Sequence, residues 1–122
     1  MARTSIPIQT LTRTGTVPGN EVKGDDVNRM YWANNHGETI VHIVNRHASN
    51  PGRVGFEFFE ETVDGVIVQD KFTDSIPAGG TIICGPFPTQ FYSRDNLDVF
   101  VNPVAGSAHS LWFRGYELEV LG

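Results

Sequence analysis

The chain has 122 residues, a net charge of −5, 13 glycines and seven prolines. This is the length of one domain, and the composition is typical of many turns and few long helices. Its 13 aromatic residues exclude a disordered chain, because such chains lack the apolar side chains that form a core. The acidic charge disfavours general nucleic-acid binding. No apolar run approaches the roughly 18 residues of a membrane span, so we expect no membrane contact either.

Residues 1–28 differ in charge and amino-acid composition from the rest of the chain. Residues 1–24 carry three basic residues and one acidic residue, whereas residues 25–122 carry six basic and 13 acidic ones. The segment is rich in Thr, Gly and Pro and has no helical period, and Pro7 restricts its apolar stretch to an edge strand or a bare arm. We expect residues 1–28 to form an extended arm and loop. The simpler alternative is a long, mobile N-terminal loop.

Residues 29–122 are expected to form a separate β-sandwich domain. Short apolar or alternating runs are separated by turn residues about every 8–12 positions, which is typical of an antiparallel sandwich or barrel. Asp64-Gly65 is the strongest hairpin signal. The expected strands follow the sequences RMYWAN, GETIVHIVNR, VGFEFFEETV, VIVQDKF, IIC, QFYS, LDVFVN and HSLWFRGYELEVL, the last with a bulge or bend at Gly115. The fold class is therefore all-β: a single antiparallel β-sandwich or small jelly-roll-like barrel with an extended N-terminal arm.

Catalytic and metal-binding patterns are missing from the sequence. The four histidines (His36, His42, His47 and His109) lack the spacing of a metal site. Cys84 is the only cysteine, and its apolar neighbours indicate a buried thiol rather than a nucleophile. A chain without disulfides suits a reducing cytoplasm. We expect no enzyme activity, catalytic residue, metal or cofactor.

Adjacent aromatic residues occur four times in the expected strands. Neighbouring residues on a strand point to opposite faces, so one ring of each pair is a candidate for an exposed interface. The candidates are Trp32, Phe59, Tyr92 and Trp112. A core with rings on two sides is the alternative. An exposed aromatic face would contact a protein or a sugar.

Several short motifs resemble, in order, those of small β-sandwich capsid decoration (cement) proteins of tailed bacteriophages. They are the opening MARTSIPIQTLTRTG, IVHIVNR, the turn SIPAGG, GPFPTQFYS, LDVFVN and the closing LWFRGYELEV. The resemblance spans most of the chain. Trp32, Trp112 and the DDVNRMYW region depart from the pattern.

The resemblance implies a non-enzymatic virion protein, made in the host cytoplasm, that binds the outside of the major capsid protein lattice and stabilises it. It also implies self-association, as a dimer or trimer. We expect Ile6, Ile8 and Leu11 to anchor the arm on the shell, with Arg3 and Arg13 bonding acidic shell groups. The acidic sandwich would face solvent. The alternatives are a carbohydrate-binding β-sandwich module and another virion component of the tail or head-completion type.

Overall fold

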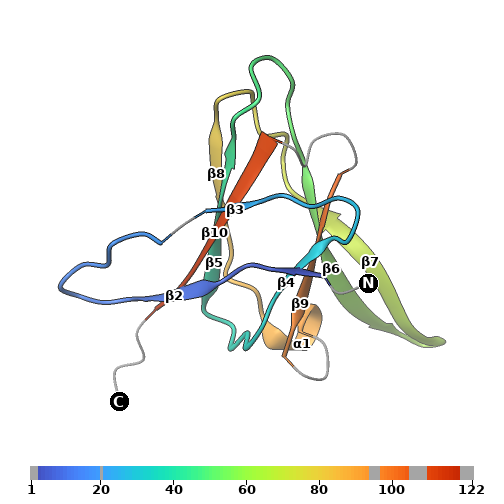
Figure 1. The fold of residues 1–122 in the computed structure, drawn as a ribbon. Coiled ribbons are helices and arrows are strands. Elements are labelled where there is room, and N and C mark those ends of the chain that lie inside the picture. Colours follow the sequence, from blue (N-terminus) through green and yellow to red (C-terminus); the bar gives the residue numbers. More distant parts are fainter. Residues whose placement is uncertain (1–2, 20, 94–96, 105–109, 119–122) are drawn as a thin grey trace.

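The computed structural model describes residues 3–19, 21–93, 97–104 and 110–118, and these form two packed β-sheets (Figure 1). In sheet order, the first has β1 (Thr4–Ser5), β4 (Met30–Trp32), β9 (Val99–Pro103), β6 (Val54–Thr62) and β7 (Gly65–Phe72). The second has β2 (Ile8–Leu11), β10 (Leu111–Leu118), β5 (Thr39–Asn45) and β8 (Thr81–Cys84), with β3 (Val22–Lys23) also paired to β10. The all-β sandwich predicted from the sequence is confirmed.

The pairing is mixed rather than wholly antiparallel. β1 runs parallel to β4, and β2 runs parallel to β10, while the remaining pairs are antiparallel. Both parallel strands come from residues 4–11, which cross from one sheet to the other at Ile6 and Pro7. The segment predicted as an arm thus supplies strands to both sheets, and its loop character is confined to the stretches around β3.

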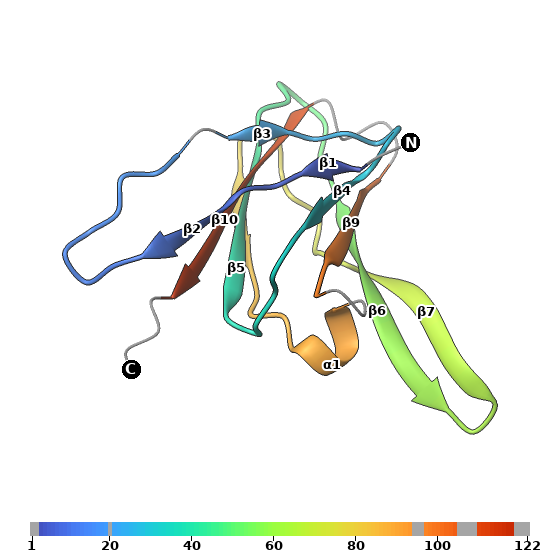
Figure 2. The ribbon, with the colours of Figure 1, turned by 60° about the horizontal axis from the view of Figure 1, so that its bottom comes forward.

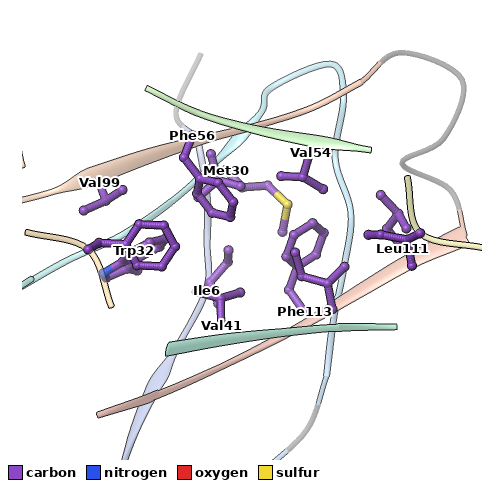
Figure 3. Packing of buried hydrophobic residues seen from close by; sticks show 13 residues of the cluster. Ile6, Met30, Trp32, Val41, Val54, Phe56, Val99, Leu111 and Phe113 are labelled. Carbon is purple, nitrogen blue, oxygen red and sulfur yellow. The ribbon is translucent and has the colours of Figure 1, made fainter. Parts of the chain in front are cut away.

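The core lies between the two sheets and draws on nearly every strand (Figure 3). β5 shows how the sequence builds it, since Thr39, Val41, Ile43 and Asn45 are buried and the residues between them are half-buried. This is the period of two that a strand requires. The buried apolar residues are Ile6, Met30, Trp32, Val41, Ile43, Val54, Phe56, Ile76, Phe87, Val99, Val101, Leu111 and Phe113.

β6 and β7 form a long hairpin whose far end extends beyond the sandwich (Figure 2). The hairpin signal at Asp64-Gly65 is confirmed, but the turn lies one residue earlier. Thr62 pairs with Gly65, so Val63 and Asp64 occupy the turn. Gly65 has a φ of 135°, a backbone conformation that favours glycine.

The structure corrects two expectations about local geometry. QFYS was predicted as a strand, but Thr89–Tyr92 forms the single helical turn α1, in which Tyr92 N–H donates to the Pro88 carbonyl at 3.1 Å. The helical turn lets Phe91 and Tyr92 both contact the Phe58 ring, at centroid distances of 5.4 and 5.3 Å. In a strand, these two adjacent rings would point to opposite faces.

Among the described residues, no helix is long and apolar enough to cross a membrane.

Gly115 is the second correction, because it does not mark a bulge. β10 stays in register with β5 through Gly115, which pairs with Val41 on one side and with Ile8 on the other. A Cβ at position 115 would collide with the Ile8 Cδ1 atom. Glycine at position 115 leaves room for the close approach of the Ile8 side chain to the strand.

Candidate interaction surface

The five residues predicted to contact a capsid divide into two groups in the structure. Arg3, Ile6, Ile8 and Leu11 lie in what we call the N-terminal segment, residues 3–11, which is built into the two sheets. Arg13 lies in what we call the Thr loop, residues 12–19, which extends away from the sandwich (Figures 1 and 2).

Arg3 is held by contacts within the chain. Its Nη1 donates to Asn102 Oδ1 at 2.8 Å and to the Met30 carbonyl at 3.2 Å, and its Nη2 donates to Glu57 Oε2 at 3.1 Å. The guanidinium also lies 3.8 Å from the centroid of the Phe100 ring. Charge-assisted bonds of this kind fix a side chain in place, so Arg3 fastens the start of the chain to the first sheet. This corrects its assignment as a shell contact.

Ile6 is a core residue rather than a free anchor. Only 1% of it is exposed, and Figure 3 shows it among buried side chains that come from both sheets. The Ile6 N–H donates to the Tyr31 carbonyl at 2.8 Å, which continues the pairing of β1 with β4. A residue buried in this way has no surface left for a partner, so its predicted role is corrected.

Ile8 and Leu11 are half-buried on β2, at the edge of the second sheet. Ile8 packs against the core cluster and over Gly115. Both residues are paired in register with β10. They retain some exposed surface, but their main contacts are within the chain.

The Thr loop is clamped at its base by the side chain of Gln9. The Gln9 amide Nε2 donates to the Val17 carbonyl at 3.0 Å, and its Oε1 accepts from the Gly19 N–H at 2.6 Å. Because Gln9 lies on β2, these bonds tie the returning leg of the loop to the second sheet. The loop is therefore closed by one side chain from the strand that precedes it.

A second clamp fixes the chain where the loop rejoins the sandwich. Arg114 on β10 donates from Nε to the Gly19 carbonyl at 3.0 Å, and its Nη2 lies 3.2 Å from Glu21 Oε1. The Arg46 guanidinium pairs with the same carboxylate oxygen. Arg114 on β10 and Arg46, which directly follows β5, thus converge on Glu21 and fix the chain where it leaves the loop.

The far end of the Thr loop is a turn closed by threonine hydroxyls. The Gly15 N–H donates to the Thr12 carbonyl at 3.2 Å, and Thr12 Oγ1 donates to the Gly15 carbonyl at 2.8 Å. The Thr12 N–H donates to Thr16 Oγ1 at 3.0 Å. Arg13 occupies this turn and is exposed, and 86% of Val17 is exposed on the returning leg. The loop presents a cation and an apolar side chain on a hydrogen-bonded frame.

The sequence reasoning missed Val17 and Gln9. Val17 is the only aliphatic residue between Thr12 and Gly19, and an isolated aliphatic side chain beside a proline in a polar loop is the signal that points to it. Nothing in the sequence marks Gln9, because its two hydrogen bonds depend on the loop folding back beside β2.

The four aromatic interface candidates are not a common exposed face. Trp32 is fully buried and makes edge contacts with Phe56 and Phe87 at centroid distances of 6.1 and 4.9 Å. Its assignment to the surface is therefore wrong. The reason is that β4 lies inside the first sheet and turns Trp32 toward the second.

The other three candidates are half-buried, on three different elements. Tyr92 packs on Phe87 at 5.2 Å, and burial raises the pKa of its hydroxyl. Trp112 on β10 is covered by the Arg46 guanidinium, 5.0 Å from the ring centroid. Phe59 lies on the β6–β7 hairpin. Each of the three rings is therefore partly covered by the protein itself.

Cys84 has the environment expected of a thiol packed against a core. It is partly buried on β8 against the core cluster, and burial raises its pKa to about 11. A thiol of this kind is protonated at neutral pH and is a poor nucleophile. Within the described ranges, no three His, Cys, Asp or Glu residues lie close enough together to hold a metal ion.

Comparison of the chain with protein-family models, with curated proteins and with solved structures gives no match.

Proposed function

We propose that the protein is a non-enzymatic virion component that binds the outside of a phage capsid and stabilises the shell, with the Thr loop as its main contact. The single observation that carries this assignment to the loop is its shape. It projects from the sandwich, and its returning leg is clamped to the second sheet by Gln9 and Arg114. The capsid itself is implied by the ordered motifs that resemble decoration proteins.

The exposed side chains of the loop define the partner by its chemistry. Arg13 supplies a guanidinium that bonds carboxylates in a planar, paired geometry, and Val17 supplies an apolar contact. A complementary shell surface therefore has acidic groups beside a shallow apolar patch. Since the hydrogen-bonded frame holds the loop in one shape, little conformational freedom is lost on binding.

Repetition favours a contact of this size. A loop of eight residues buries less surface than a stable one-to-one complex requires. A capsid offers many identical sites, and linked copies bind such sites more tightly than one copy does. The contact of each copy can therefore be weak while the decorated shell remains stable.

The test is co-sedimentation of the purified protein with undecorated capsids. Arg13→Glu and Val17→Asp are expected to lower the bound fraction strongly, because each places a carboxylate against an acidic or apolar surface. Lys23→Glu is the matched control, since Lys23 is exposed on β3 outside the loop and the charge change is the same. No binding by the wild-type protein would overturn the function, and equal losses in the Lys23 control would overturn the role of the loop.

A further inference from the structure

The outer edge of β7 is a row of exposed apolar residues. β7 is the last strand of the first sheet, and in the described part of the chain it pairs with β6 alone. Val66, Ile67 and Val68 are 61%, 49% and 52% exposed, and Phe72 is 52% exposed. Proteins usually protect such an edge with lysine, proline or a bulge, because an open edge pairs with other strands. Residues 65–69 of β7 contain none of these residues.

The hydrogen-bond pattern shows which residues direct their backbone groups outward. The Thr73 N–H donates to the Val54 carbonyl, and the Val104 N–H donates to the Arg53 carbonyl. Residue 54 therefore directs its backbone groups toward β7, and residue 53 directs its backbone groups toward β9. Along β6 the even-numbered residues bond to β7, where each lies opposite an odd-numbered residue. Since the direction alternates along a strand, even-numbered positions from Val66 to Phe72 direct N–H and C=O groups away from the sheet.

The two charged side chains of β7 are already engaged within the molecule. Asp70 Oδ1 accepts from Asn102 Nδ2 at 3.0 Å, and the Lys71 ammonium lies 4.8 Å from the centroid of the Phe58 ring. A strand that approaches this edge therefore meets mostly apolar side chains and backbone donors and acceptors. The partner that this edge suits must be an apolar strand with few charges.

We propose that the partner is β7 of a second copy, paired antiparallel about a two-fold axis that passes beside Gln69. In this register Val66 lies opposite the second copy's Phe72, Ile67 lies opposite Lys71, and Val68 lies opposite Asp70. Aromatic and β-branched residues placed opposite each other stabilise a strand pair, and the two-fold axis produces each of these pairs twice. The two first sheets then form one continuous sheet.

Neighbouring registers of the same two strands are less favourable. An axis at Val68 places Phe72 opposite Asp64 instead of Val66. An axis at Ile67 places Asp64 opposite Asp70, and like charges directly opposite each other are destabilising. Axes between residues are excluded because paired residues must point to the same face of the sheet. The registers at Gln69 and at Val68 pair equal lengths of β7, and of the two only the register at Gln69 places Val66 opposite Phe72.

The edge and the Thr loop lie on opposite sides of the molecule (Figures 1 and 2). Pairing through β7 therefore leaves both loops of a dimer exposed. If the loop binds a shell as proposed above, the dimer carries two shell contacts and gains from avidity. Self-association and shell binding are measured by different experiments, so the failure of one leaves the other standing.

Sedimentation velocity of the purified chain tests the proposal. The wild-type protein is expected to be a dimer, and Val68→Asp is expected to be a folded monomer, because it places a carboxylate directly opposite the second copy's Asp70 on both sides of the axis. Val63→Asp is the matched control. Val63 is fully exposed in the hairpin turn, outside the paired residues, so this variant should remain a dimer. A wild-type monomer at about 100 μM, a trimer, or a dimeric Val68→Asp variant would overturn the proposal.

Crosslinking tests the register and does not depend on the folding of the Val68→Asp variant. In a Cys84→Ala background, Gln69→Cys should form a disulfide-linked dimer under mild oxidation, because residue 69 faces its own copy in a close, non-hydrogen-bonded pair. Val68→Cys is the control, since the two copies of residue 68 lie diagonally, too far apart to be bridged. Crosslinking through residue 68 and not residue 69 would overturn the register.

Discussion

The N-terminal segment and the Thr loop are adjacent in sequence and similar in composition, yet they have different roles in the fold. Each contains threonines, one arginine, one proline and at least one β-branched aliphatic residue. In the segment, Arg3 and Ile6 face the protein. In the loop, Arg13 and Val17 face solvent. Composition alone does not separate the two parts.

The difference comes from strand pairing. β1 and β2 pair with strands of opposite sheets, so the residues between them must cross the open side of the sandwich, and Ile6 is directed into the core. After Leu11 the chain leaves the sheet, and no strand within the described ranges pairs with residues 12–19. A segment that closes the core is therefore a poor attachment arm, and the loop that follows it is a better one.

Replacement of Ile6 by alanine is expected to produce the largest effect. Truncation of a fully buried isoleucine costs about 2–5 kcal/mol, because the lost contacts leave a cavity. Urea unfolding measures this change in the free energy of unfolding. Val17→Ala is the control and is expected to change stability by less than about 0.5 kcal/mol. Equal stability of the two variants would contradict the placement of Ile6 in the core.

Replacement of Arg3 by alanine is expected to have the next largest effect. It removes the donors to Asn102 and to the largely buried Glu57 carboxylate, at a cost of about 1–3 kcal/mol. Arg3→Lys should recover only part of the loss, since lysine cannot make the paired bonds. Arg13→Ala, measured in the same thermal unfolding series, should be near neutral. A greater loss for Arg13 than for Arg3 would reverse the comparison.

Replacement of Gln9 by alanine should affect the loop more than the fold. It removes two hydrogen bonds at the base of the loop, so we expect a stability loss of about 1 kcal/mol or less. Amide exchange of Gly19 should accelerate, and shell binding should weaken because the loop loses its fixed shape. Gln90→Ala, at an exposed position on α1, is the control. Unchanged exchange at Gly19 would show that Gln9 does not clamp the loop.

The smallest expected effect concerns Asp25, which ties the N-terminal segment to the chain before β4. Thr4 Oγ1 donates to Asp25 Oδ2 at 2.7 Å, and this bond, followed by that from the Asn28 N–H, lowers the pKa of Asp25 below 3.8. The stabilisation is complete above pH 3.8 and is lost as the pH falls through the lower pKa of the folded state. In an NMR titration, Thr4→Val should move the pKa of Asp25 back toward 3.8. An unchanged titration would contradict this link.

The strand content and the hairpin could be predicted from the sequence because they depend on local signals. The β-branched run within residues 40–44 and the Asp64-Gly65 dipeptide are visible without any knowledge of the partner strands. α1 could not be predicted in this way, because a single helical turn after Pro88 is favoured by two rings that contact Phe58. That preference is a property of the tertiary packing.

The candidate site was harder to predict than the fold. Arg3, Ile6 and Trp32 have side chains that suit either an interface or an interior. Only the pairing of β1 and β4 decides that Ile6 and Trp32 are buried. Arg13 was predicted as a contact of the extended arm, and the structure places it exposed in the Thr loop; its binding to a shell stays a prediction.

A density map of the decorated particle tests the central claim most directly. We predict that the Thr loop lies against the shell, with Arg13 beside acidic groups and Val17 on an apolar patch, while residues 3–11 remain between the two sheets as in the free protein. A map in which residues 3–11 leave the sandwich and run across a neighbouring capsid subunit, with the Thr loop in solvent, would contradict the account.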